Sequence, residues 1–184
     1  MHREIPSRIR AAVGWVNQPD PAGSPVTVLP DGCMDLMWID GRLLVSGADT
    51  TARVAPRSPG AKVGLRLAPG HLPTVLGLPA DELVDQQVLL TEVPLDEAGR
   101  RAVEHAQNAL TAAGPRVEVL ETLAEQLGIG AATTGFADAV AHRALLGTDV
   151  RTMADDLGLG TRQLHRRCLA AFGYGPKLLS RVLR

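Results

Sequence analysis

Hydrophobic residues in the first half of the chain come in short runs, with Pro, Gly and Asp between them. The runs lie in "PVTVLPDG", "CMDLMWIDG", "RLLVSG", "TTARVAP" and "AKVGLRLAPG". Short runs between turn-forming residues predict β-strands. Asp40-Gly41 favours the positive φ angles of a tight turn, so "WIDGRLLV" predicts a hairpin. Several such strands predict that residues 1–93 fold as a small β-barrel or sandwich.

The pattern becomes helical after this region. "LPTVLGLPADELVDQ" first predicts two short helical turns, the second opened by Pro79. Residues 94–128 then predict a connector of two helices, separated by Gly114 and Pro115. The second of these helices carries an apolar stripe at helical spacing, made of Val119, Leu120, Leu123 and Leu127. Two alternatives remain for the connector: its stripes pack on the barrel, or they form the seam of a homodimer.

The last segment, residues 134–184, follows a linker, "GIGAATTG", and predicts an all-helical domain. "FADAVAHRALLG" predicts its first helix. Thr148-Asp149 caps a second helix, and Gly158 ends it in a left-handed turn. A third helix spans residues 161–172. The two helices pack through apolar side chains, namely Leu157, Leu159, Leu164 and Cys168. A helix, a tight turn and a second helix make a helix-turn-helix pattern.

The third helix has one apolar and one basic side. Leu164, Cys168 and Phe172 face inward at spacings of four. On the other side, basic side chains at i, i+3 and i+4 are placed to enter a DNA major groove. The predicted DNA-binding residues are Thr161, Arg162, His165, Arg166 and Lys177. The alternative is an ordinary solvated helix face with an idle surface histidine.

Charge is unevenly distributed along the chain. The net charge of the 184 residues is −1, yet residues 150–184 hold seven basic and two acidic side chains. This segment therefore carries +5 and the first 149 residues carry −6, which suggests one surface for a polyanion. Two cysteines far apart in sequence predict a reducing compartment. No signal-peptide core and no long apolar run occur, so we expect a cytoplasmic protein without a membrane partner.

The C-terminal stretch "LGLGTRQLHRRCLAAFGYGPKLLSRVLR" resembles the first helix-turn-helix of the AraC/XylS family of bacterial transcription regulators. The residues that match the family pattern are Gly158, Leu159, Arg162, Leu164, Arg166, Gly173, Pro176, Leu183 and Arg184. Gly160 replaces a capping Ser of the family and Cys168 replaces a Phe. The resemblance implies that Arg162, His165 and Arg166 contact bases in double-stranded DNA.

The resemblance extends upstream. "VLPDGCMDLMWIDGRLLVSGADT" and "GLRLAPGHLPTVLGLPADELVD" are similar to the N-terminal domain of an AraC-like subgroup common in actinobacteria. That likeness implies a cupin-like, barrel-shaped sensor for a small-molecule effector, or a domain that mediates dimerisation. The family pattern has two helix-turn-helix motifs joined by a long helix. This sequence matches it only as far as that helix, which leaves two alternatives open: a truncated product, or a protein that works with one DNA-reading motif.

Few residues in the first half suggest chemistry. The side chains that could bind a metal are Asp31, Cys33, Asp35 and His71. Cupin metal sites use closely spaced histidines plus a carboxylate, a pattern that this sequence lacks, so no metal or cofactor is predicted. Arg66, between two leucines, points either into or out of the barrel. Three residues alternate partly like one strand face and favour the core over a pocket, namely Met34, Met37 and Trp38.

The sequence therefore predicts an α+β protein that binds DNA sequence-specifically and regulates transcription. No nucleophile motif of the G-x-S-x-G type and no glycine-rich phosphate loop occur, so no enzyme is predicted. Two alternatives stay open. One is a truncated ligand-binding or dimerisation module that does not bind DNA by itself, and the other is a cupin-like enzyme.

Overall fold

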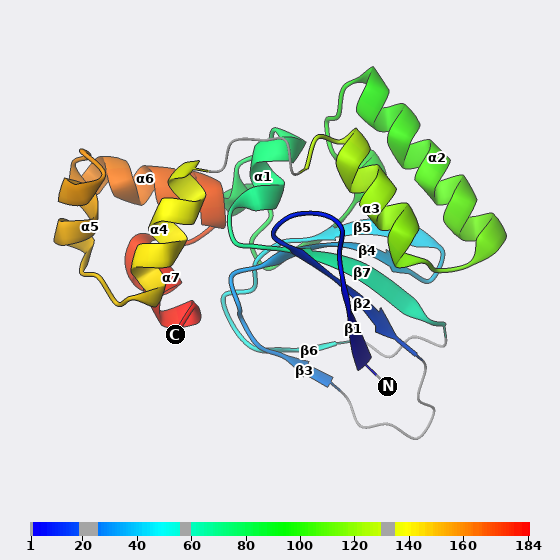
Figure 1. Cartoon of the computed structure of the whole chain (residues 1–184), viewed down its shortest axis with the longest axis horizontal. Coiled ribbons are helices and arrows are strands. Elements are labelled where there is room, and N and C mark those ends of the chain that lie inside the picture. The colour runs from blue at the N-terminus through cyan, green and yellow to red at the C-terminus, as the bar shows by residue number, and fades with distance from the viewer. Residues whose placement is uncertain (1, 19–25, 56–59, 130–134) are drawn as a thin grey trace.

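The short hydrophobic runs form an antiparallel sheet in the computed structural model, which describes residues 2–18, 26–55, 60–129 and 135–184 (Figure 1). Six strands lie in the spatial order β1 (His2–Pro6), β2 (Ala12–Asn17), β7 (Lys62–Leu67), β4 (Met34–Ile39), β5 (Arg42–Ser46) and β8 (Gln87–Leu89). A separate two-stranded ribbon consists of β3 (Val26–Val28) and β6 (Arg53–Ala55). With helices after the strands, the predicted α+β class is confirmed.

The predicted barrel is wrong in one respect, because the sheet is open. Strands β1 and β8 are its two outer strands, and no hydrogen-bonded pairing joins them in the described part of the chain. β1, β2 and β8 were also not predicted from the sequence. The first of them is mostly polar and exposed, so its residues join the sheet through backbone pairing with β2 instead of through burial.

The predicted hairpin between β4 and β5 is confirmed. Ile39 pairs with Arg42, and the two turn residues between them, Asp40 and Gly41, have φ angles of 49° and 80°. Two successive positive φ angles match the right-handed twist of the flanking strands.

One face of the sheet is covered by helices α2 (Glu97–Ala113) and α3 (Val117–Gln126) (Figure 1). Alternate strand residues such as Leu36 and Leu65 point into the core beneath them and are fully buried. Gly14 of β2 makes room for the start of α3, since a Cβ there would lie 2.5 Å from Val117 Cγ1. The apolar stripes of the connector therefore pack on the sheet.

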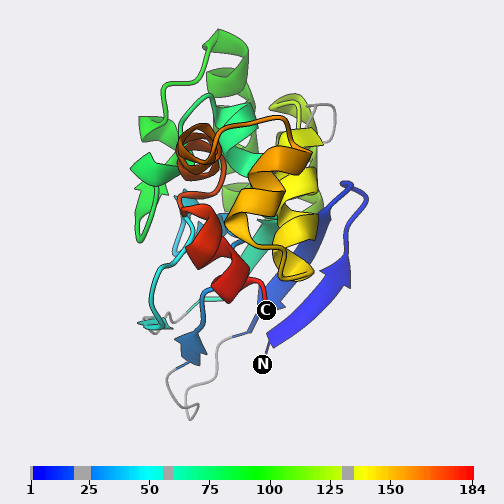
Figure 2. The same cartoon turned by 90° about the vertical axis from the view of Figure 1, so that its left-hand side faces the viewer.

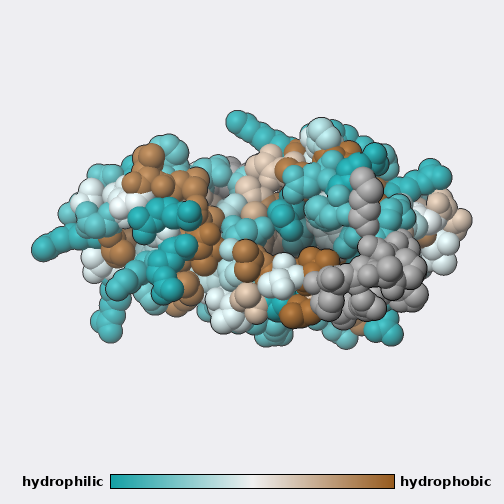
Figure 3. Space-filling view, turned by 90° about the horizontal axis from the view of Figure 1, so that it is seen from below, coloured by the Kyte–Doolittle hydropathy of each residue, from teal (hydrophilic) through white to brown (hydrophobic). Residues whose placement is uncertain are grey.

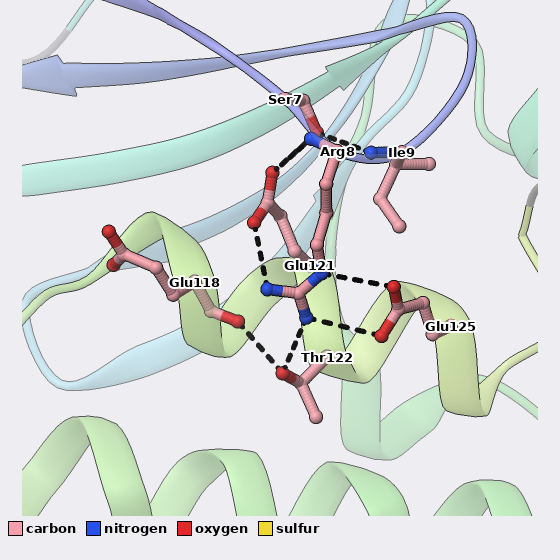
Figure 4. A network of polar contacts seen from close by, with 7 residues as sticks. All are labelled: Ser7, Arg8, Ile9, Glu118, Glu121, Thr122 and Glu125. Carbon is pink, nitrogen blue, oxygen red and sulfur yellow. Dashed lines mark hydrogen bonds and ion pairs between the residues drawn. The ribbon is translucent and has the colours of Figure 1, made fainter.

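A polar network fixes α3 to the loop between β1 and β2 (Figure 4). Arg8 binds Glu125 with two hydrogen bonds of 3.0 and 3.1 Å and also donates to Thr122 Oγ1. Glu121, which is buried, accepts hydrogen bonds from Ser7 Oγ at 2.6 Å and from the Arg8 backbone nitrogen at 2.9 Å. The ion pairs and hydrogen bonds of this network attach the loop between β1 and β2 to α3.

The C-terminal helices gather at one end of the sheet (Figures 1 and 2). They are α4 (Gly135–Leu145), α5 (Val150–Asp156), α6 (Thr161–Phe172) and α7 (Pro176–Val182). Three short elements lie between β7 and α2 in the sequence, namely α1 (His71–Leu76), η1 (Ala80–Glu82) and η2 (Leu90–Glu92), and the first two of them contact α6. The linker predicted at 128–135 falls largely outside the described residues.

Close backbone approaches join the C-terminal helices to the sheet end. A Cβ on Gly70 would lie 2.6 Å from Ala137 Cβ, and one on Gly173 would lie 2.3 Å from Val84 Cγ2. Tyr174, which is buried, donates its hydroxyl hydrogen to the backbone carbonyl of Asp49. The C-terminal helices thus share an apolar core with the sheet.

Candidate nucleic-acid interface

Helix α5 begins at a well-formed cap. The Asp149 carboxylate accepts hydrogen bonds from the backbone nitrogens of Arg151 and Thr152, at 3.0 and 3.1 Å, and from Thr152 Oγ1 at 2.6 Å. These bonds satisfy donors that a helix start otherwise leaves unpaired. They also hold the pKa of Asp149 below its usual value, with the Thr152 hydroxyl as the main cause.

A tight turn separates α5 from α6. Gly158 has a φ angle of 64°, and the backbone nitrogen of Leu159 donates to the carbonyl of Ala154 at 2.9 Å. Such a left-handed residue and the bond back into the helix end α5 within one turn. Gly160 stands at the N-cap of α6 and offers no side-chain bond, as its sequence position predicted. The amides at the start of α6 therefore lack a side-chain partner.

The apolar side of α6 is buried as the sequence predicted. Leu164, Cys168 and Phe172 have no exposed surface, and Ala154 of α5 is also fully buried. Burial raises the pKa of the Cys168 thiol to about 12, so this cysteine is a packed apolar residue at neutral pH. Four-residue spacing fixes which side of α6 faces the protein and which faces solvent.

The predicted DNA-binding side chains are all exposed; they are Thr161, Arg162, His165 and Arg166 of α6, and Lys177 of α7. We call these five residues the candidate DNA face. Arg162 and Arg166 stand one helical turn apart, on the side of α6 opposite its buried residues. Figure 3 shows hydrophilic side chains projecting from the end of the molecule formed by these helices.

His165 lies at the border of this face. Its imidazole rests against the turn between α6 and α7, since a Cβ on Gly175 would lie 2.8 Å from His165 Nε2. Arg162 and Arg166 extend into solvent, whereas His165 is supported by a backbone contact. The structure thus brings His165 toward α7, the helix that carries Lys177.

The basic residues of this face have no carboxylate partner within the described residues. No ion pair involves Arg162, Arg166 or Lys177 there, although Arg143 of α4 pairs with Asp156 of α5 at 3.0 Å. Unpaired guanidinium groups keep their full hydrogen-bonding capacity for an external acceptor. The arrangement suits a polyanion.

Sequence reasoning missed the role of Arg167. Its guanidinium carbon lies 4.0 Å from the centroid of the Phe136 ring, so it stacks on α4. Neighbouring in sequence to Arg166, it faces a different element. No pattern in the sequence indicates this contact, because Phe136 lies on a separate helix and is brought close only by the fold.

The candidate metal ligands of the first half do not form one group. Asp31, Cys33 and Asp35 lie together, but both aspartates form ion pairs with Arg66. His71 lies elsewhere, with its Nε2 2.9 Å from Asp138 Oδ1. Among the residues that the structure describes, no three His, Cys, Asp or Glu side chains are placed to hold a metal ion. The three residues expected in the core are buried, namely Met34, Met37 and Trp38.

A surface groove lies between α2 and α3. It has a volume of about 290 Å³, and its lining mixes polar side chains such as His105, Arg116 and Glu118 with alanine and leucine. The charged side chains that line it are of both signs.

The molecule combines an antiparallel sheet with a helical group at one end, and that group has an exposed basic surface. Residues 12–89, which span β2 to β8, match a protein family described as a domain of unknown function, DUF6597. This domain is known in AraC-type regulators. No curated protein and no solved structure matches the chain. In the described part of the chain, every helix is too short or too polar to cross a membrane.

Proposed function

We propose that the protein is a sequence-specific, DNA-binding transcription regulator of the AraC type that acts in the cytoplasm. In this proposal α5, the turn at Gly158 and α6 are the helix-turn-helix, and α6 enters the major groove. The sheet domain senses a small molecule or mediates dimerisation. The proposal rests on the resemblance of residues 157–184 and on the family match at residues 12–89.

One observation carries the proposal: the basic side chains of the candidate DNA face are exposed and have no acidic partner in the described residues. An arginine held by a carboxylate would have to give up that bond before contacting DNA. Arg162 and Arg166 pay no such cost. The terminal planar groups of both are then available for two acceptors of guanine.

The remaining members of the face suit the phosphate backbone. Thr161 and the uncapped amides of the α6 N-terminus can donate to a phosphate oxygen. Lys177 stands at the start of the next helix and carries a point charge. Binding through such groups releases counterions from DNA, so affinity falls steeply as salt concentration rises.

The test selects binding sites from a random duplex library at low salt and then compares variants on the selected sequence. Arg166→Ala is expected to lose about 1–3 kcal/mol of discrimination at one base pair. Lys177→Ala should weaken binding to all sequences alike and lower the salt slope by about 1. Arg42→Ala, an exposed arginine of β5, is the matched control and should change neither quantity.

Two results would count against the proposal. Unchanged sequence preference in Arg166→Ala would remove the role assigned to α6. Absence of any selected sequence at low salt would favour the alternative of a ligand-binding or dimerisation module that does not bind DNA by itself.

A further inference from the structure

The sheet face turned away from α2 and α3 carries a polar cluster. Trp15 lies flat across Gly64, where a Cβ would come within 2.2 Å of the indole ring. The indole Nε1 donates to Asp35 Oδ1 at 2.7 Å. Arg66 stands opposite Asp35 in the register of β4 and β7. Side chains from three adjacent strands therefore meet at one place.

Within the part of the chain that the structure describes, ion pairs without a direct side-chain hydrogen bond hold the Arg66 guanidinium. Its Nε lies 3.6 Å from Asp35 Oδ1, and its NH1 lies 3.4 Å from Asp31 Oδ2. Charged pairs that bond directly are separated by about 2.7–2.9 Å. The buried Nε atom has no hydrogen-bond partner in the described residues. A third of the Arg66 side chain is nevertheless open to solvent, so its terminal nitrogens can be reached.

Charge limits what could bind. With both carboxylates ionised, Asp31, Asp35 and Arg66 carry a net charge of −1. Burial raises the pKa of the Cys33 thiol to about 12, so that neighbour adds no charge at neutral pH. A simple anion would be repelled by two carboxylates, and a simple cation would leave the Arg66 donors unbonded. A ligand that carries a negatively charged acceptor and a positively charged donor satisfies both the Arg66 donors and the carboxylates.

We propose that Asp31, Asp35 and Arg66 form the effector site of the regulator, and that the site takes a small zwitterion of the amino-acid class. The ligand carboxylate binds the terminal nitrogens of Arg66. The ligand ammonium group lies beside Asp31, whose side chain is 46% exposed. The name effector site rests on the proposed function. The existence of the binding site does not rest on it.

The site is in contact with the C-terminal helices. Gly32, between Asp31 and Cys33, has a φ angle of 75°, and a Cβ there would lie 3.0 Å from Leu183 Cδ2 at the end of α7. The Cys33 backbone nitrogen donates to Asp31 Oδ1 at 2.9 Å, so the position of the carboxylate is coupled to the turn. A ligand that draws Asp31 toward itself therefore moves the surface on which Leu183 packs.

The experiment uses the full chain labelled with ¹⁵N and ¹³C, with NMR signals of the Trp15 indole and the Leu183 methyls as reporters. Each standard amino acid is added up to about 10 mM. For any amino acid that binds, two analogues follow: the same molecule without its amino group and the same molecule without its carboxylate. We expect saturable shifts of both reporters with at least one amino acid and with neither analogue.

Variants keep the test independent of folding. Asp31→Asn retains the oxygen that accepts from the Cys33 nitrogen but removes the charge, and should weaken binding at least about tenfold. Asp81→Asn in η1 removes a charge from an exposed surface and should leave binding unchanged.

Three results would overturn the proposal: no amino acid shifts the Trp15 signal, the analogue without an amino group shifts it equally, or Leu183 stays unmoved when Trp15 responds. A failure of DNA binding leaves these reporters intact, so it is distinguishable from a failure of the site.

Discussion

Two pairs of arginines, Arg8 and Arg53 on the sheet side of the molecule and Arg162 and Arg166 on α6, differ in whether a carboxylate holds them. In the sheet domain and its connector, Arg8 bonds Glu125, and Arg53 bonds Asp49 with nitrogen–oxygen distances of 2.8 and 3.0 Å. In the C-terminal helices, Arg162 and Arg166 have no carboxylate partner within the described residues. The first pair fixes one element against another. The second pair joins no two elements through an ion pair in the described residues, so it makes no such contribution to folding.

The first pair has a structural role, because each arginine is bonded to a carboxylate that it holds in place. Arg162 and Arg166 are exposed charges without such a partner in the described residues, and exposed charges contribute little to folding. Four substitutions test this distinction, in order of decreasing expected effect.

Removal of Glu121 should have the largest effect on stability. Glu121→Ala leaves Ser7 Oγ and the Arg8 backbone nitrogen without their acceptor, and should lower the free energy of unfolding by about 2–3 kcal/mol. Urea denaturation followed by circular dichroism measures it. Glu118→Ala, on the exposed side of the same helix, is the control, and an equal loss in both variants would show that the network does not hold α3.

Loss of the hydrogen bond from the Tyr174 hydroxyl to the Asp49 carbonyl, which joins the two halves, should have the next largest effect on stability. Tyr174→Phe leaves the Asp49 carbonyl without its donor and should cost about 1 kcal/mol. The loss is measured in the same denaturation assay. Ser180→Ala removes a buried hydroxyl that bonds only within α7, so it tests whether the effect is specific to the contact between halves. A smaller loss in Tyr174→Phe than in Ser180→Ala would contradict the role of that contact.

Asp35 should give stability a small pH dependence. Burial is the main cause that raises its pKa above the ordinary 3.8, and attraction to Arg66 opposes the rise. The folded protein therefore binds this proton more tightly than the unfolded chain does. The resulting stabilisation is complete below pH 3.8 and is lost as pH rises through the raised pKa.

The measurement compares unfolding free energies of the natural protein and Asp35→Asn over a pH series. The difference between them should fall as pH increases. A difference that grows with pH would show that Arg66 outweighs burial, and that the polar cluster is a tight ion pair like that of Arg8.

Changes on the candidate DNA face should have the smallest effect on stability. Arg162→Ala and Arg166→Ala are expected to alter the free energy of unfolding by less than about 0.5 kcal/mol, since neither side chain has a partner to lose in the described residues. Arg8→Ala serves as the contrast in the same assay. A marked loss of stability in either α6 variant would end the distinction between the two kinds of arginine.

Much of the C-terminal region could be predicted from local signals. Asp149, Gly158 and the four-residue spacing of Leu164, Cys168 and Phe172 act within a few residues of themselves, and caps and turns of this kind form wherever the sequence allows. The Asp40-Gly41 hairpin belongs to the same class. These features depend on backbone angles and helical period, both of which are encoded locally.

Other features depended on distant residues. His165 was expected to project with Arg162 and Arg166, yet it rests against Gly175. β1 was missed because its polar residues show no alternation, and only pairing with β2 makes it a strand. Arg66 had two orientations open to it, and the register of β4 against β7 placed it opposite Asp35.

The α+β class, the turns and helix boundaries of the last segment, and its surplus of positive charge all follow from the order of the amino acids. The open sheet, the covering of one of its faces by the connector helices, and the docking of the C-terminal helices on its end depend on the folded molecule. Turns and helices follow from neighbours along the chain. Strand register and ion pairing follow from which distant residues are buried together, and that is settled only when the whole core packs.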